Sequence, residues 1–313
     1  MDYIKVQEPI LPLLKSTEKI LAGQIGSKVH LISELRQYTP VGKGKKIRAA
    51  FFFLLAGMNR LRGDDLPRLA AAIEMLHLSS LIHDDIVDNS SRRRGEKTPN
   101  HHFGNYLSVL WGDYLFINSL HMLASEWRSP TMDMLLDVSK QMIEGQILEF
   151  ENGFNYQIPL RTYFAIIRKK TSSMFAGIAG LVAQMKAGAS RPAADFYSFG
   201  RDFGMIFQIS DDLIDIFSDQ AGKDRFQDLR EGKVTLPYIL LLQHDRLPLM
   251  QNFSKTRPQS LLARCQEFGI KEQSLKIIDR YYRKCSSFLG SFPSSPHRES
   301  MACLLDFIRY REY

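Results

Sequence analysis

The chain contains 313 residues, of which 44% are hydrophobic, 11% aromatic and 24% charged. This apolar and aromatic content excludes an intrinsically disordered chain, and only 20 glycines and 13 prolines exclude collagen-like or low-complexity character. Lysine and arginine number 41 against 34 acidic residues, a formal net charge of +7 that is compatible with nucleic acid, an anionic membrane or a small anionic substrate as the partner.

Targeting and redox features indicate a cytoplasmic chain. The longest apolar stretches, residues 49–58 and 175–185, are shorter than the ~20 residues that span a bilayer. The first residues lack a basic segment followed by an apolar core, so we expect no signal peptide. Cys265, Cys285 and Cys303 lack metal-ligand spacing, and we expect them to be reduced.

Helical periodicity dominates the sequence. Helices are expected, in chain order, around residues 66–76, 132–147, 160–187, 199–217, 236–243 and 275–288. Asp64 and Asp65 are candidate caps of the first of these helices, and residues 151–157 and 286–298 have the composition of loops. The sequence has no strand-like alternation bounded by Asn-Gly or Asp-Gly turns. We predict an all-α fold of about ten helices, in a single domain over residues 1–313.

Two acidic clusters lie within apolar helical segments. In His83-Asp84-Asp85-Ile86-Val87-Asp88, the side chains of Asp84 and Asp88 lie one turn apart on one face. The second cluster, Asp211-Asp212-Leu213-Ile214-Asp215, repeats this spacing. Uncompensated carboxylates are costly in such surroundings, whereas carboxylate oxygens suit Mg²⁺, which also binds substrate phosphates. One such string could be a charged surface turn, but two favour a metal site.

Two polar stripes extend these acidic faces along their helices. The first consists of His77, Ser80, Asp84 and Asp88. The second consists of Gln208, Asp211 and Asp215. A lone histidine on an apolar helix is more often a core residue, but the alignment of His77 with the acids favours a pocket.

Several basic clusters accompany the acids. They are residues 43–48, Arg92-Arg93-Arg94, Arg168-Lys169-Lys170, Lys223 and Lys233. Each cluster alone is compatible with a solvated face or with nucleic acid. The β elements of nucleases and polymerases are missing, however, and guanidinium and ammonium groups also bind diphosphates. Acids and bases together suggest two diphosphate substrates, one held through metal and one mainly by cationic side chains.

At these motifs the sequence resembles the trans-isoprenyl diphosphate synthases, also called polyprenyl synthetases. The two acidic clusters look like the two aspartate-rich regions of that family. The supporting motifs are Gly44-Lys45-Lys46-Ile47-Arg48, Gly112-Asp113-Tyr114-Leu115, Lys170-Thr171 and Gly232-Lys233-Val234-Thr235-Leu236-Pro237. The ordered match covers most of the chain. The resemblance implies the isoprenoid synthase fold, a single helical bundle around a deep central cavity, usually dimerised.

The resemblance also implies roles for individual residues. The Mg²⁺ ligands would be Asp84, Asp88 and Asp211, with Asp215 nearby. The allylic diphosphate would be held by Arg93, Lys170, Thr171, Gln208 and Lys223, with Lys233 as a further candidate. Isopentenyl diphosphate would be held by Lys45, Arg48, His77 and Arg94. Catalysis would depend on Asp84, Asp88, Asp211, Lys170 and Lys223.

These groups imply a prenyl transfer. Mg²⁺, Lys170, Lys223 and Arg93 would stabilise the charge that develops on the departing diphosphate. The isopentenyl double bond would then attack the allylic carbocation in a head-to-tail condensation, and loss of a proton, with the released diphosphate as the acceptor, would give a product one isoprene unit longer. Apolar walls would keep water away from the cation.

Two other functions share parts of this pattern. A terpene cyclase of the same fold is disfavoured, because cyclases typically have a different second acidic motif and need no isopentenyl site. A non-catalytic subunit of a heteromeric synthase tends to lose the acids that are present here. A catalytic chain that requires such a partner stays open, so we expect a homodimer with a heteromer as the alternative.

The sequence departs from the family pattern at residue 49 and over residues 224–227. Ala49 stands where the family commonly has proline, and residues 224–227 replace a stretch that usually contains glycine in the loop over the diphosphate. In the family, bulky aromatic residues four or five positions before the first aspartate close the product tunnel. Those positions are Ser79 and Ser80, so we predict a medium- to long-chain product.

Deeper side chains would then set the product length, and the candidates are Phe116, Ile117 and Leu120. If the two serines only allow close helix packing and another side chain blocks the tunnel, a geranylgeranyl or farnesyl diphosphate product remains the alternative.

Overall fold

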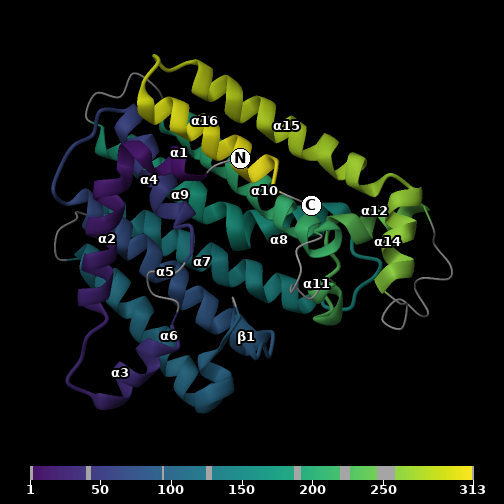
Figure 1. The fold of residues 1–313 in the computed structure, drawn as a ribbon, viewed down its shortest axis with the longest axis horizontal. Coiled ribbons are helices and arrows are strands. Elements are labelled where there is room, and N and C mark those ends of the chain that lie inside the picture. Colours follow the sequence, from purple (N-terminus) through teal and green to yellow (C-terminus); the bar gives the residue numbers. More distant parts are fainter. Residues whose placement is uncertain are drawn as a thin grey trace. The chain divides into compact units, whose positions relative to one another are not determined.

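The computed structural model describes residues 3–39, 44–93, 95–124, 129–186, 192–218, 226–244 and 258–311, and it confirms the all-α prediction (Figure 1). The first helices are α1 (Tyr3–Gln7), α2 (Leu11–Gln24), α3 (His30–Gln37), α4 (Ile47–Met58), α5 (Leu66–Val87), α6 (Pro99–Ala124) and α7 (Ser129–Glu151). The later helices are α8 (Leu160–Ile167), α9 (Ser173–Met185), α10 (Ala193–Phe217), α11 (Gln227–Arg230), α12 (Leu236–His244), α14 (Pro258–Glu267), α15 (Ile270–Gly290) and α16 (Pro296–Arg309).

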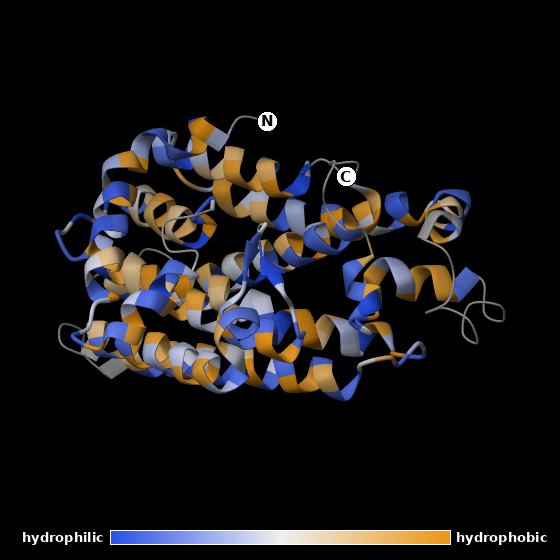
Figure 2. Ribbon diagram, turned by 60° about the horizontal axis from the view of Figure 1, so that its bottom comes forward, coloured by the Kyte–Doolittle hydropathy of each residue, from blue (hydrophilic) through white to orange (hydrophobic). Residues whose placement is uncertain are grey.

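Four short elements complete the described secondary structure. A 3₁₀ turn (Glu8–Ile10) precedes α2, and a π-helical segment (Arg168–Ser172) joins α8 to α9. The strands β1 (Arg92–Arg93) and β2 (Glu96–Lys97) pair antiparallel. Figure 2 shows hydrophilic and hydrophobic residues alternating along most helices, whereas the hairpin is hydrophilic, as expected of helices that each bury one face.

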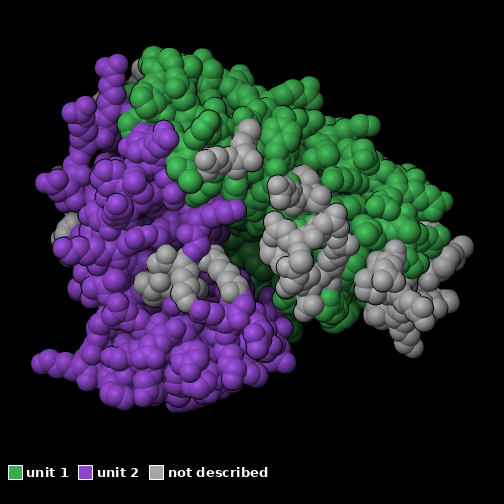
Figure 3. Space-filling view, in the orientation of Figure 1, with its two compact units in different colours: residues 1–5, 134–313 green, residues 6–133 purple. Residues whose placement is uncertain are grey.

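The contacts of the chain divide it into two compact units, which Figure 3 colours separately. Unit 2 comprises residues 6–133, and unit 1 comprises residues 1–5 and 134–313. The single domain over residues 1–313 stays a prediction, and each unit is described by itself below.

Unit 2 is built around α5, which packs against α2, α4 and α6. Every side chain of α4 from residue 49 to 56 is at most 1% exposed. At the start of α4, the backbone N–H of Ala49 donates to the buried Glu74 of α5 over 2.9 Å. A proline at position 49 would lack this donor, so the hydrogen bond to Glu74 is one that the proline common in the family could not make.

Unit 1 is built around α10, which packs against α9, α15, α16 and the π-helical segment. Aromatic rings fill this core, and the rings of Phe199 and Phe288 stack with their centroids 4.5 Å apart. The backbones of α9 and α10 approach closely, because a Cβ at Gly200 would lie 2.2 Å from the Phe175 carbonyl oxygen. Only glycine permits this packing.

Two predicted segments differ from the structure. Residues 286–298 are not one loop, because α15 continues to Gly290 and α16 begins at Pro296. The serine and proline that indicated a loop start a helix instead, since Ser295 is an N-cap that accepts from the Arg298 N–H over 3.2 Å. The helix predicted over residues 160–187 is interrupted by the π-helical segment.

Candidate functional site

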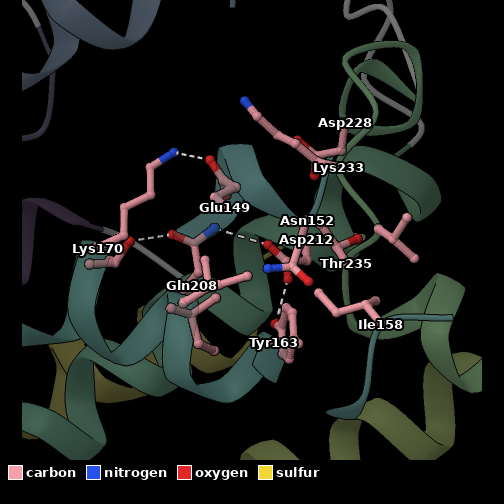
Figure 4. A pocket seen from close by; sticks show the side chains of 14 residues that line it. Glu149, Asn152, Ile158, Tyr163, Lys170, Gln208, Asp212, Asp228, Lys233 and Thr235 are labelled. Atoms are coloured by element: carbon pink, nitrogen blue, oxygen red, sulfur yellow. Dashed lines mark hydrogen bonds and ion pairs between the residues drawn. The ribbon is translucent and has the colours of Figure 1, made fainter. Parts of the chain in front are cut away.

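The second acidic cluster lies on α10 in unit 1, and its middle carboxylate is buried. Asp212 is 2% exposed. Its Oδ2 accepts from the Tyr163 hydroxyl over 2.5 Å, and its Oδ1 accepts from Gln208 Nε2 over 2.9 Å. The Gln208 Oε1 accepts from the Thr171 hydroxyl over 2.7 Å. Figure 4 shows this run of hydrogen bonds from α8 through α10 to the π-helical segment.

Burial raises the pKa of three acids in and near the second acidic cluster, Asp212, Asp215 and Asp228. Burial raises the pKa of Asp212 to about 7, although hydrogen bonds from Tyr163 and Gln208 oppose the shift. Burial also raises the pKa of Asp215 to about 6, opposed by backbone donors at Gln227 and Asp228. The Asp228 carboxyl has a raised pKa because it is buried and lies near Asp215 and Asp212. A bound cation would therefore offset a real electrostatic cost here.

The π-helical segment presents Lys170 and Thr171, and it is held by close backbone packing. A Cβ at Gly145 of α7 would lie 2.4 Å from the backbone nitrogen of Lys170, and one at Gly204 of α10 would lie 2.5 Å from the Ser172 Cα. The Lys170 ammonium donates to Glu149 of α7 over 2.5 Å. Two helices therefore fix the backbone of this segment, and a carboxylate holds its lysine.

A cavity of about 110 Å³ lies beside these groups in unit 1. Its polar lining includes Glu149, Lys170, Thr171, Gln208, Asp212, Asp228, Lys233 and Thr235. Lys233 reaches the lining from a turn in which Gly232 has a positive φ of 79° and accepts at its carbonyl from the Phe154 N–H over 2.8 Å. The Lys233 ammonium pairs with Glu231 over 2.7 Å.

The two outer acids of the second cluster, Asp211 and Asp215, are partly buried and have different surroundings from Asp212. One oxygen of Asp215 accepts from the Gln227 N–H over 2.9 Å, while its Oδ2 is buried with no hydrogen-bond partner. Asp211 pairs with Arg311 near the C-terminus, whose guanidinium also lies 4.4 Å from the centre of the Phe207 ring. In the described part of the chain, no group of three or more His, Cys, Asp or Glu side chains could hold a metal ion.

The residues of the second cluster nevertheless fit a divalent cation. Asp211 and Asp215 lie one helical turn apart, as the sequence predicts. The unsatisfied Oδ2 of Asp215 is an oxygen donor in a site where burial penalises its charge. Hard oxygen ligands of this kind are those that Mg²⁺ and Ca²⁺ prefer.

The first acidic cluster ends α5 in unit 2 and is organised in the same way. Its middle acid, Asp85, is 2% exposed and accepts from Nε and Nη2 of Arg93, both over 2.8 Å. Asn100 donates to the Asp85 carbonyl oxygen over 3.1 Å. Asp84 and Asp88 are partly buried. The hairpin of β1 and β2 therefore brings Arg93 to the middle acid of the cluster, and its predicted role in binding the allylic diphosphate stays a prediction.

Other predicted residues of unit 2 lie on α4, α5 and the segment before α4. Lys45 is exposed, whereas Arg48 and His77 are partly buried. Ser79 is 3% exposed and donates to the Gly112 carbonyl of α6 over 2.9 Å, and Ser80 donates to the His77 carbonyl over 2.8 Å. The hydrogen bond of Ser79 supports a role in close packing of α5 and α6.

The deeper chain-length candidates lie on α6. Phe116 and Leu120 are partly buried, and Ile117 is 60% exposed. Two predicted site residues, Arg94 and Lys223, lie outside the described residues, as do residues 224 and 225 of the loop that departs from the family pattern.

Unit 1 therefore brings together Lys170, Thr171, Gln208 and Lys233 at one cavity, beside the second acidic cluster. It also adds functional candidates that no motif had indicated: Tyr163, Glu149, Asp228 and Arg311. Glu149 and Asp228 are ordinary acids within helical sequence, and Tyr163 occurs on the apolar face of α8 with the buried Ile166 and Ile167. None of the helices in the described ranges combines the length and apolarity needed to cross a membrane.

Comparison with known proteins gives consistent matches. A sequence profile of the polyprenyl synthetase family matches residues 29–267. The octaprenyl diphosphate synthase of Haemophilus influenzae is 32% identical over 97% of this chain and 95% of its own. Component 2 of the heptaprenyl diphosphate synthase of Geobacillus stearothermophilus is 29% identical over 96% of both chains.

The fold is also similar to that of a solved polyprenyl synthase. The polyprenyl synthase of Caulobacter crescentus CB15, solved in complex with calcium and isoprenyl diphosphate, matches with a TM-score of 0.92 at 24% identity. That match covers 100% of this chain and 98% of the other. The likeness supports the predicted fold class.

Proposed function

The chain belongs to the polyprenyl synthetase family, and on this premise we propose that it condenses isopentenyl diphosphate with an allylic diphosphate to a medium- or long-chain all-trans polyprenyl diphosphate. It is accordingly a prenyltransferase. The observation that carries the proposal is the grouping of Lys170, Thr171 and Gln208 around one cavity beside the second acidic cluster. Lys170 offers a cation to an anionic group, and the hydrogen bond from Thr171 to Gln208 fixes the two side chains beside it.

We assign the allylic diphosphate to the cavity of unit 1. Lys170 and Lys233 provide positive charge, and the hydrogen bond from the Thr171 hydroxyl to Gln208 fixes the segment that carries Lys170. Both lysines pair with carboxylates, Glu149 and Glu231. A diphosphate would exchange these partners for phosphate oxygens, so the lysines are already oriented before the substrate arrives. As the resemblance implies, Lys223 and Arg93 are further candidates for binding the allylic diphosphate. Lys45, Arg48, His77 and Arg94 are the candidates for binding isopentenyl diphosphate.

We infer Mg²⁺ as the metal, with Asp84 and Asp88 as its ligands in unit 2 and Asp211 and Asp215 as its ligands in unit 1. Bound Mg²⁺ supplies neutralisation of the charge on a departing diphosphate. The orphaned, buried Oδ2 of Asp215 supports this assignment for the second cluster. The middle acids Asp85 and Asp212 are held by donors of the protein, so we assign them to orienting the clusters.

A medium- or long-chain product is supported by the names of the relatives and by the small side chains before Asp84. The relatives described above are named as octaprenyl and heptaprenyl diphosphate synthases. Ser80 is small and partly buried on α5. Because Ser79 is committed to the α6 backbone, Ser80 is the position at which added bulk should reach the product.

We propose a homodimer as the working assembly. Exposed apolar residues at helical spacing lie on α6 in unit 2, namely Tyr106, Val109, Leu110 and Ile117. A second such stripe lies on α7 in unit 1, namely Leu136, Ile143, Ile147 and Phe150. Stripes of this kind mark protein–protein contacts. A heteromer is the alternative, because one relative is named as a component of a synthase.

The three cysteines are free thiols, and two of them are buried. This supports the proposal of a reducing, cytoplasmic environment.

The test of the proposed function is incorporation of labelled isopentenyl diphosphate by the purified single chain, with an allylic primer and Mg²⁺. We expect activity that chelator abolishes. Asp84→Ala and Asp211→Ala should each lower turnover at least about a hundredfold, because the loss falls on charge that develops in the transition state. The control is Asp137→Ala, at an exposed position of α7. Full activity in excess chelator, or unfolding of both site variants, would contradict the proposal.

A further inference from the structure

Tyr163 carries a buried hydroxyl to which the proposed chemistry gives no direct role. It lies on α8, is 3% exposed, and donates to Asp212 Oδ2 over 2.5 Å. Burial, together with the neighbouring charge of Asp212, raises the pKa of Tyr163 well above its ordinary value. Its phenol therefore stays protonated and serves Asp212 as a hydrogen-bond donor.

The hydrogen bonds that continue from Asp212 have a fixed direction. Because Asp212 Oδ1 is an acceptor, it holds the Gln208 amide with Nε2 towards the carboxylate, at 2.9 Å. A flipped amide would set a carbonyl oxygen against the carboxylate, which is repulsive. The Gln208 Oε1 is thereby turned towards Thr171 and accepts its hydroxyl proton over 2.7 Å. In Figure 4 the run ends beside Lys170.

Each link of this run lies in unit 1 and is shielded from water to a different degree. Tyr163 and Asp212 are almost fully buried, Thr171 is 8% exposed, and Gln208 is partly buried at the cavity. The side-chain orientation set by Tyr163 and Asp212 at the buried end is therefore passed on to Gln208 and Thr171 at the cavity. Hydrogen bonds in such a setting polarise one another and fix side-chain orientation.

We propose that Tyr163 is a positioning residue for the allylic diphosphate, acting through Asp212 and Gln208 to anchor Thr171, and with it the π-helical segment that carries Lys170. The inference rests on the proposed function, because Thr171, Gln208 and Lys170 are the groups assigned to that diphosphate. Tyr163 also lines the cavity, but its hydroxyl proton is donated to Asp212. Removing its hydroxyl leaves Asp212 Oδ2 without its donor, and Asp212 and Gln208 can then adopt other arrangements.

The experiment compares Tyr163→Phe with Tyr282→Phe. The control is matched, because the Tyr282 hydroxyl of α15 also donates to a carboxylate of unit 1, Asp306, over 2.6 Å, and Tyr282 does not line the cavity. For Tyr163→Phe we expect KM for the allylic diphosphate, and Kd for a non-hydrolysable allylic thiodiphosphate, to rise about tenfold, as loss of one hydrogen bond to a charged group produces. The melting temperatures of the two variants should be similar, and Tyr282→Phe should keep the wild-type KM.

Two results would overturn the inference. One is a wild-type KM and Kd in Tyr163→Phe. The other is a loss in Tyr163→Phe that follows only the fraction of folded protein, with KM unchanged. A wild-type chain that is inactive with both substrates would instead contradict the proposed function, so the two failures are distinguishable.

A second variant keeps the test decisive if Tyr163→Phe does not fold. Asp212→Asn keeps the size of the side chain but leaves one acceptor oxygen for two donors, so it should raise KM in the same direction. Adding Tyr163→Phe to Asp212→Asn should change KM little further, because both act on one link. Wild-type binding by Asp212→Asn, or effects of the two substitutions that multiply, would contradict a relay through Asp212.

Discussion

Gly204 is the position at which a single methyl group should disturb the substrate site through packing alone. It lies on α10 against the π-helical segment, where an added Cβ would meet the Ser172 Cα at 2.5 Å and the Ser172 Cβ at 3.0 Å. Carbon atoms pack at about 3.5–4.0 Å, so the backbones would have to separate by about 1 Å. Overpacking of this kind costs about 1–3 kcal/mol. The displaced segment carries Lys170 and Thr171.

We therefore expect Gly204→Ala to lower the free energy of unfolding by about 1–3 kcal/mol and to raise KM for the allylic diphosphate. Urea unfolding followed by circular dichroism measures the first effect, and initial rates measure the second. The control is Gly290→Ala in α15, where an added Cβ has no atom within 4 Å. That variant should be neutral or more stable by up to about 1 kcal/mol. A Gly204→Ala protein with wild-type stability and KM would refute the packing argument.

Three further predictions concern product length, metal binding and pH. Ser80→Phe should shorten the product seen by mass spectrometry without abolishing condensation. Ser79→Phe should destabilise the fold, because the Ser79 side chain is 3% exposed and hydrogen-bonded to the backbone of α6. An unchanged product from a folded Ser80→Phe enzyme would contradict the predicted control of product length. Arg311→Ala removes a cation from Asp211 and should tighten Mg²⁺ binding severalfold in calorimetry, and weaker binding would argue against competition. The pKa of Asp212 is raised from 3.8 to about 7 by burial, so between these values the folded state binds more protons than the unfolded state. Stability of the metal-free protein should fall as pH rises through that window, less steeply in Asp212→Asn; equal slopes for both proteins would contradict the assignment.

The sequence predicts the fold class and the two acidic clusters because both depend on short-range periodicity. Asp84 and Asp88 share a helix face by spacing alone, and so do Asp211 and Asp215. The grouping of Lys170, Thr171 and Gln208 could also be anticipated, but only through resemblance to a family. Helical spacing by itself does not bring α10 to the π-helical segment.

Long-range contacts explain what the sequence does not predict. Tyr163 precedes Asp212 by 49 residues, and the pairing depends on how the tertiary fold brings α8 to α10. The π-helical segment is set by contacts with Gly145 and Gly204 of two other helices, so its own residues read as ordinary helix. Ser295 and Pro296 have the composition of a loop, and their capping role depends on the helix that follows.

The central claim is that this chain extends an allylic diphosphate to a medium- or long-chain polyprenyl diphosphate. The most direct measurement is mass spectrometry of the dephosphorylated product made by the purified chain from farnesyl diphosphate, excess isopentenyl diphosphate and Mg²⁺. The account predicts an all-trans product longer than geranylgeranyl diphosphate, formed only with metal. A product that stops at geranylgeranyl diphosphate would contradict the predicted chain length, and a cyclised hydrocarbon would contradict the prenyl transfer itself.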